Sequence, residues 1–102
     1  MTKLAVLGAG SWGTTFAKVL ADGGSEVTIW ARRKELAREI TIAKRNSDYL
    51  PGINLPQTLS ADSDLSRVLK DAEIVFLAVP SQSLRQNLLE AQPLLAEETI
   101  LV

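Results

Sequence analysis

Three glycines near the amino terminus constrain the fold of this chain more than any other feature. Gly8, Gly10 and Gly13 follow a short apolar run, residues 3–7, and precede a segment with helical periodicity. Gly8 would permit a tight turn, Gly10 a close approach of the backbone to a pyrophosphate, and Gly13 close packing of the helix on the strand. The pattern predicts a dinucleotide-binding turn with the phosphates at the helix start. The plainer alternative is a strand-to-helix turn without a ligand.

Apolar runs and helical patterns alternate along the whole chain. Strands are expected at residues 3–7, 26–30, 58–60, 74–79 and 99–102, and helices at 11–22, 33–44, from Ser63, and from Ser81 or Ser83. Residues 46–57, which include Pro51, Gly52 and Pro56, are expected to form a loop. This alternation predicts an α/β fold of the Rossmann type: a doubly wound, mainly parallel sheet with helices on both faces.

Length and composition limit what the chain can do. Its 102 residues suffice for one domain, and we expect residues 1–102 to form a single dinucleotide-binding domain. The net charge of −1, without a basic stripe, argues against a nucleic-acid partner. No apolar run approaches the roughly 20 residues that a membrane span needs, so no membrane insertion is expected. Because the amino terminus also lacks the apolar region of a signal peptide, we expect a cytoplasmic location.

The sequence contains neither cysteine nor histidine. Disulfides, thiolate metal sites and a cysteine nucleophile are therefore excluded, and the commonest general base and metal ligand is missing. We assign no catalytic residue and no metal ligand. Residues 98–102 have the pattern of a strand that ends without a turn, which indicates a piece of a longer protein.

The end of the second expected strand carries information about the cofactor. NAD-selective domains place an acidic residue about 20 residues beyond the glycines to hold the ribose 2′-hydroxyl. This sequence has Arg32 and Arg33 there instead. Guanidinium groups can hold a 2′-phosphate through paired charge-assisted hydrogen bonds, which favours NADP (NADPH) while leaving NAD as a second cofactor. The alternative, a solvated helix start, is disfavoured because cations oppose the dipole at that end of a helix.

Four further residues are candidate cofactor contacts. Ser11 adds a hydroxyl donor beside the glycines, and Trp12 would face the ligand or a neighbouring domain unless it belongs to the core. Pro80 follows the most apolar strand, where the nicotinamide half of a cofactor would lie, although a buried strand with a proline stop needs no ligand. Tyr49 precedes a Pro-Gly turn and would flank the cofactor, or else pack within its loop.

Together these motifs resemble the amino-terminal domain of the bacterial NAD(P)-dependent glycerol-3-phosphate dehydrogenases. The resemblance covers essentially the whole chain. The glycine turn is shared with many families, whereas the Trp-x-Arg strand end and the Tyr-Leu-Pro-Gly loop are more specific. The runs that carry it are residues 8–14, 27–32, 49–52 and 78–81, together with Asn46.

The resemblance implies reversible hydride transfer between NAD(P)H and dihydroxyacetone phosphate, giving sn-glycerol 3-phosphate for phospholipid synthesis. It also implies that Ser11, Trp12, Arg32, Arg33 and Tyr49 touch the cofactor. The catalytic lysines of the family match no lysine here, so the missing helical domain would bind the small phosphate substrate and this chain alone would be inactive. A homodimer is compatible with the full-length protein.

Two alternatives stay open at the level of sequence. The same sheet and glycine turn serve other oxidoreductases of the 6-phosphogluconate-dehydrogenase type, which act on hydroxyacids, ketopantoate or pyrroline carboxylate. A non-catalytic nucleotide-sensing Rossmann module, as in ion-channel regulation, carries the same turn. Such modules usually keep an acidic residue at the second strand end, so Arg32 and Arg33 argue against them.

Overall fold

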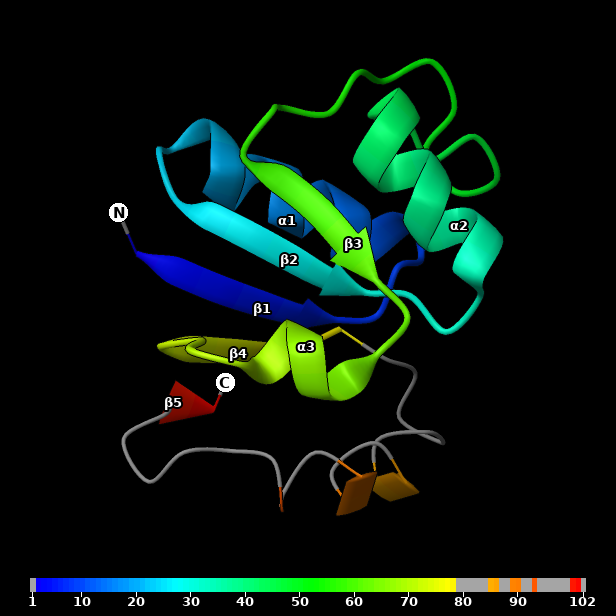
Figure 1. The fold of residues 1–102 in the computed structure, drawn as a ribbon. Coiled ribbons are helices and arrows are strands. Elements are labelled where there is room, and N and C mark those ends of the chain that lie inside the picture. The colour runs from blue at the N-terminus through cyan, green and yellow to red at the C-terminus, as the bar shows by residue number, and fades with distance from the viewer. Residues whose placement is uncertain (1, 79–84, 87–88, 91–92, 94–99, 102) are drawn as a thin grey trace.

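The computed structural model describes residues 2–78, 85–86, 89–90, 93 and 100–101. Parallel strands form one sheet in the order β3-β2-β1-β4-β5 (Figure 1). The elements follow one another as β1 (Lys3–Leu7), α1 (Ser11–Asp22), β2 (Glu26–Trp30), α2 (Lys34–Arg38), η1 (Glu39–Ala43), β3 (Leu59–Asp62), α3 (Leu65–Leu69), β4 (Ile74–Leu77) and β5 (Ile100–Leu101). The predicted doubly wound α/β fold is confirmed.

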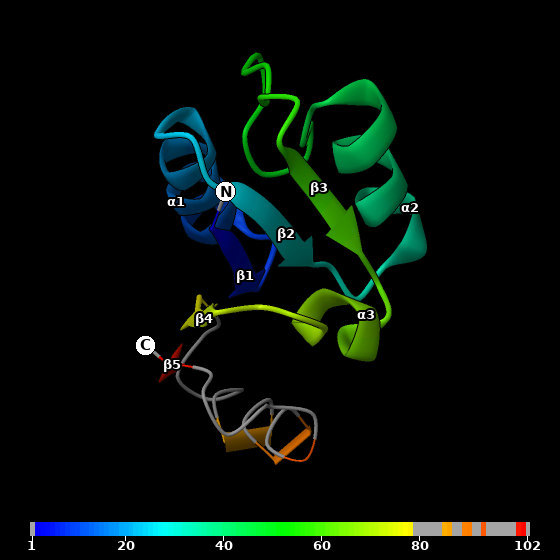
Figure 2. The same cartoon turned by 60° about the vertical axis from the view of Figure 1, so that its left-hand side comes forward.

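Helices cover both faces of the sheet, which explains why β1 is buried almost throughout. Leu4 and Val6 point into a core shared with α1, α2 and η1, whereas Ala5 and Leu7 point into a second core closed by α3. Accordingly, α1 lies behind the sheet in Figure 1 and α3 in front of it. Figure 2 shows α1 and α2 beside different strands, in agreement with the contacts of α1 to β2 and of α2 to β3.

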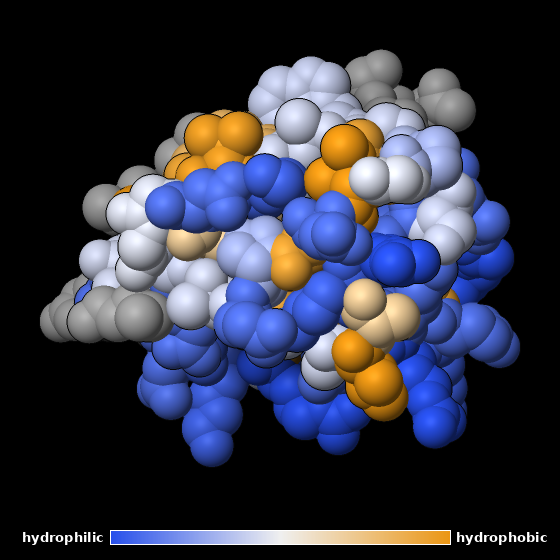
Figure 3. Space-filling view, turned by 90° about the horizontal axis from the view of Figure 1, so that it is seen from above, coloured by the Kyte–Doolittle hydropathy of each residue, from blue (hydrophilic) through white to orange (hydrophobic). Residues whose placement is uncertain are grey.

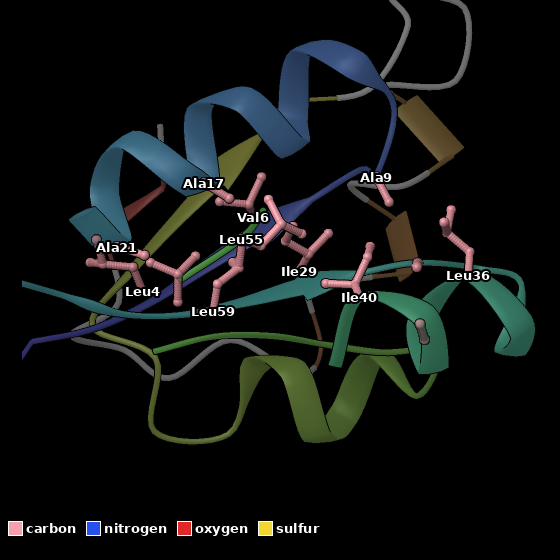
Figure 4. Close-up of a cluster of buried hydrophobic side chains, with 13 residues drawn as sticks. Leu4, Val6, Ala9, Ala17, Ala21, Ile29, Leu36, Ile40, Leu55 and Leu59 are labelled. Carbon is pink, nitrogen blue, oxygen red and sulfur yellow. The ribbon is translucent and has the colours of Figure 1, made fainter. Parts of the chain in front are cut away.

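The larger core lies between the sheet and α1 with α2 and η1 (Figure 4). Ala17 and Ala21 of α1 are small, so the helix axis can approach the side chains of Val6, Val27 and Ile29 closely. Seen from above, on the side that carries the β3 edge, hydrophobic side chains form separate spots among hydrophilic ones (Figure 3). That distribution suits a face in contact with water.

The first helix ends where the glycines predict. Gly23 caps α1 by donating its N–H to the carbonyl of Val19, and Gly24 has a φ of 102°, a conformation that side chains other than glycine rarely adopt. The predicted span of residues 11–22 is therefore confirmed.

The expected helix over residues 33–44 differs in its second half. The α-helix stops at Arg38, and a π-helical turn, η1, continues to Ala43 before Lys44 takes the left-handed conformation with a φ of 56°. In this wider turn Thr41 exchanges two hydrogen bonds of 2.9 Å with the backbone of Ala61 in β3. Apolar periodicity could not predict that difference, because it depends on a partner 20 residues away.

The remaining elements shift by a few residues. β3 begins at Leu59 and runs to Asp62, later than the expected 58–60. α3 is capped by Asp64, whose side chain accepts the N–H of Ser66, so the expectation of a start at Ser63 was wrong by one position. β4 is described to Leu77. The predicted start of a helix at Ser81 or Ser83 lies outside the described residues.

Candidate functional site

The carboxyl ends of β1 and β2 lie side by side and lead into the turn with the glycines and into the two arginines. Leu7 pairs with Trp30 in the register of the two strands, and the N–H of Gly8 donates to the carbonyl of Trp30 at 3.2 Å. The arrowheads of both strands meet at one edge of the sheet in Figure 1. Ligands of open α/β sheets bind outside this edge.

Two of the glycines are required by the fold itself. Gly8 has a φ of 126°, which is strained for any residue with a Cβ. A Cβ added to Gly13 would lie 2.2 Å from the carbonyl oxygen of Gly8 and 3.2 Å from the Cβ of Ala78. Glycine at position 13 thus lets α1 approach the end of β1, as the sequence predicted.

Gly10 differs from both, because nothing among the residues that the structure describes requires a glycine there. Its φ of −73° and ψ of −174° are open to any residue, and a Cβ would meet no atom of the described residues within 4 Å. The space over Gly10 is therefore open at the point where a pyrophosphate would approach the backbone. A glycine with a free Cβ position fits a ligand better than it fits a turn alone.

The start of α1 has the properties of an anion site. Gly10 is its N-cap, no side chain caps the helix, and no acidic residue occupies the first turn. Within the described part of the chain, the first N–H groups of the helix therefore have no capping side chain, and the dipole of this twelve-residue helix favours negative charge beside them. Donors of this kind, next to the open space over Gly10, suit the phosphates of a dinucleotide.

Ser11 and Tyr49 come together at this helix start. The Ser11 hydroxyl donates to the backbone carbonyl of Tyr49 at 2.6 Å, although 38 residues separate the two in the sequence. Tyr49 is 43% exposed, so part of it is accessible to a ligand. Both residues thus border the open space over the glycine turn.

Trp12 lies on the outer side of α1 and is 69% exposed, so the alternative that it belongs to the core was wrong. Its ring lies 5.2 Å from that of Phe16, which in turn contacts Phe76 edge-on at 4.9 Å. Ser11, Trp12, Thr15, Phe16 and Val19 line an open, mostly apolar pocket. Trp12 is positioned to face a ligand or another domain.

Both arginines after β2 are more than half exposed and have acidic neighbours. The guanidinium of Arg32 lies 4.5 Å from the ring centroid of Trp30 and 3.6 Å from a carboxylate oxygen of Glu90. Arg33 donates to Asp48 at 3.1 Å, and this hydrogen bond raises the pKa of Arg33 above its usual value. Both guanidinium groups thus lie at the edge where a 2′-phosphate would lie.

An ion pair at the end of β3 escaped the sequence analysis. Asp62 accepts two hydrogen bonds from Arg67, at 2.8 and 2.9 Å, and these hold the pKa of the Asp62 carboxyl below its usual value. Asp62 pairs in register with Trp30, next to the two arginines. The sequence did not predict this pair, because Asp62 ends a strand and Arg67 lies in the following helix, and no regular spacing relates residues across such a connection.

Asn46 is a second residue that the sequence analysis left without a role in the site. It is fully buried beneath the glycine turn and donates to the carbonyl of Ala9. A polar residue inside a loop rich in proline and glycine is expected at the surface, so the sequence did not predict that Asn46 is buried. Pro80, by contrast, lies outside the described residues.

Within the described part of the chain, no group of three or more acidic, histidine or cysteine side chains is arranged to hold a metal ion. None of its helices is long and apolar enough to cross a membrane.

Known proteins share this arrangement. The family described as "NAD-dependent glycerol-3-phosphate dehydrogenase N-terminus" matches residues 3–102. Over 97 residues the chain is 59% identical to a glycerol-3-phosphate dehydrogenase [NAD(P)+] of Leifsonia xyli, covering 95% of this chain and 26% of that protein.

Solved structures agree with the family match. Glycerol-3-phosphate dehydrogenase from Coxiella burnetii superposes with a TM-score of 0.91 at 34% identity, over 98% of this chain and 31% of that one. The enzyme of the yeast Saccharomyces cerevisiae gives a TM-score of 0.91 at 31% identity, over 98% and 32%. This chain thus spans between a quarter and a third of the length of these relatives. These findings favour the family over both alternatives, and the chain belongs to the amino-terminal domains of the NAD-dependent glycerol-3-phosphate dehydrogenases.

Proposed function

We propose that this domain binds NADP(H), and NAD(H) as a second cofactor, through the glycine turn and the start of α1. The observation that carries the proposal is the open Cβ position of Gly10 beside an uncapped helix. In this arrangement the pyrophosphate takes the place of the missing capping side chain, and the first N–H groups of α1 donate to its oxygens. When bound, the nicotinamide ring supplies the hydride.

The proposed contacts follow the edge of the sheet. Gly8 and Gly13 shape the turn, and Gly10, Ser11 and Trp12 border the pyrophosphate. Tyr49 closes the site from the loop side, since its carbonyl is already hydrogen-bonded to Ser11. We assign the nicotinamide side to Pro80 from its place after β4.

Arg32 and Arg33 are proposed to bind the 2′-phosphate of NADPH. Both are charged and more than half exposed at the carboxyl end of β2, where the adenosine ribose of a dinucleotide lies in this fold. The relatives are named as NAD(P)+ enzymes, which is consistent with a site that accepts both cofactors. Charge-assisted, bidentate hydrogen bonds to phosphate favour NADPH.

For the whole protein we propose the reversible reduction of dihydroxyacetone phosphate to sn-glycerol 3-phosphate, in support of phospholipid synthesis. This chain spans between a quarter and a third of the length of the relatives, so catalytic residues and the pocket for the phosphate substrate are assigned to the remainder of the protein. We propose a cytoplasmic enzyme, because nicotinamide dinucleotides are held inside cells. We further propose that the full-length protein is a homodimer. It has no nucleic-acid partner in this proposal, because the net charge of this chain is −1.

The test of cofactor binding is Gly10→Val. The backbone of Gly10 suits a β-branched residue and its Cβ position is empty, so the substitution leaves the melting temperature unchanged while filling the space for the pyrophosphate. We expect calorimetric titration to show affinities for NADPH and NADH lowered by about tenfold or more. Gly23→Ala, at the other end of α1, is the control and keeps both affinities. Wild-type affinity in the Gly10→Val variant, or no binding by the unsubstituted chain, would contradict the proposal.

A further inference from the structure

Asn46 joins the loop after η1 to the glycine turn through a buried hydrogen-bond network. Its Nδ2 donates to the carbonyl oxygen of Ala9 at 2.9 Å and to Oγ1 of Thr14 at 2.8 Å. The Thr14 hydroxyl donates to the same carbonyl at 3.2 Å. Asn46 and Thr14 are both fully buried, so the Ala9 carbonyl is held by two side-chain donors that water does not reach.

This network fixes a donor of the candidate site. The peptide between Ala9 and Gly10 is planar and trans, so the Ala9 carbonyl and the Gly10 N–H point in opposite directions. Holding the carbonyl inward therefore directs the Gly10 N–H away from Asn46 and Thr14. Among the described residues, no partner of the Gly10 N–H is found.

The same side chain also orders the neighbouring loop. Its Oδ1 accepts the N–H of Tyr49 at 3.4 Å, and its backbone carbonyl accepts the N–H of Leu50 at 2.7 Å. Since the Tyr49 carbonyl accepts the Ser11 hydroxyl, Asn46 stands between the loop and the turn and contacts both. Two roles can thus be separated: orientation of the turn, and placement of the loop.

We propose that Asn46 is a positioning residue for the pyrophosphate: it holds the Ala9–Gly10 peptide so that its N–H is presented to the phosphate oxygens. This inference rests on the proposed dinucleotide site at the turn. A donor that is already oriented needs no reorganisation when the ligand binds. Loss of this orientation should therefore weaken binding of the pyrophosphate, which NADH and NADPH share. Loss of loop placement alone would instead act through the Arg33–Asp48 pair, at the end that distinguishes the two dinucleotides, and would change the affinity for NADPH without changing that for NADH.

The experiment is Asn46→Asp in the 102-residue chain, with affinities for NADPH and NADH measured by calorimetry at neutral pH. The variant keeps the size of the side chain and one acceptor oxygen but replaces the donor to Ala9 with a carboxylate. We expect both affinities to fall about tenfold and by the same factor within about twofold. Thr41→Val is the matched control, because it removes side-chain hydrogen bonds of 2.9 Å to Ala61 away from the turn. It lowers the melting temperature and leaves both affinities intact.

A second pair of variants keeps the test decisive if Asn46→Asp does not fold. Thr14→Val removes the other donor to the Ala9 carbonyl and weakens both dinucleotides about threefold, whereas Thr14→Ser keeps the hydroxyl and restores binding. Unchanged affinity in the folded variants, or a change in affinity confined to NADPH, would overturn the positioning role and leave the proposed function standing. Failure of the unsubstituted chain to bind either dinucleotide would overturn the proposed function and this assignment with it.

Discussion

Gly13 approaches Gly8 so closely that a Cβ on Gly13 would lie 2.2 Å from the Gly8 carbonyl oxygen. This distance is well below any normal contact, and the obstructing atom belongs to the backbone of the turn rather than to a flexible side chain. The close approach also brings Gly13 against the Cβ of Ala78 at the end of β4. One glycine thus fixes the distance from α1 to two neighbouring strands.

Gly13→Ala is therefore expected to destabilise the domain strongly. Relief of the clash requires a shift of α1 or of the Gly8 turn, which costs about 3 kcal/mol and lowers the melting temperature by on the order of 15 °C. Thermal unfolding followed by circular dichroism measures the change. Gly10→Ala is the control and keeps the wild-type melting temperature, since its Cβ meets nothing within 4 Å. Equal melting temperatures for the two variants would contradict the close packing of α1.

Removal of both arginines after β2 should abolish a preference for NADPH. The unsubstituted domain is expected to bind NADPH about tenfold more tightly than NADH, because two guanidinium groups meet the 2′-phosphate. In Arg32→Ala/Arg33→Ala the two affinities become equal through the loss of NADPH binding alone. Calorimetry with both dinucleotides measures this.

The control for that experiment removes the same charge elsewhere. Arg38→Ala/Lys70→Ala takes two cations from exposed positions, and Lys70 lies beside Lys3 at the opposite end of the sheet. Its preference for NADPH should persist. Equal affinities for NADPH and NADH in the unsubstituted domain would refute the assignment of the arginines.

Asp48 is bound to Arg33 at 3.1 Å and would therefore compete with a 2′-phosphate for its guanidinium. In Asp48→Asn the guanidinium keeps a neutral acceptor but loses the anionic partner, so NADPH affinity should rise a few-fold while NADH affinity stays the same. The difference should shrink as salt is added, because exposed charges are screened. Weaker NADPH binding by this variant would mean that Asp48 orients Arg33 rather than competing for it.

The Asp62–Arg67 pair makes stability depend on pH in the acid range. The pKa of Asp62 is lower in the folded protein than the ordinary value of 3.8, chiefly through its hydrogen bonds with Arg67. Its contribution is therefore complete above pH 3.8 and is lost as the pH falls through the lower, folded-state pKa. Asp62→Asn should lower stability slightly at neutral pH, and the difference should vanish in strong acid.

Denaturant unfolding at a series of pH values checks this. Arg67→Gln should reproduce the effect. The double variant should be no less stable than the less stable of the two single variants, because both substitutions break the same interaction. Additive losses would show that the two side chains act independently.

The predictable parts of the fold depend on residues close in sequence. Gly23 and Gly24 end α1 where expected, and the Gly8 and Gly13 positions follow from a turn of fixed geometry. The arginines at the end of β2 were identified for the same reason, since their place depends only on the strand that precedes them.

Features that depend on distant partners were not predictable. The π-helical turn near Thr41 relies on Ala61, and the burial of Asn46 relies on Ala9, 37 residues earlier. Trp12 shows the converse, because an aromatic residue at helical spacing predicts a core position as readily as the exposed one that it occupies. Local pattern cannot tell which face of a helix another element covers.

Because no side chain caps the start of α1, a dinucleotide bound there would become part of the folding equilibrium of the domain. A ligand that satisfies those N–H groups binds only the native state, and at one hundred times its dissociation constant it adds about 2.7 kcal/mol of stability. Newly made protein would thus resist proteolysis in proportion to the cellular supply of the cofactor. The helix end left open by the sequence would then link the lifetime of the protein to the supply of its proposed cofactor.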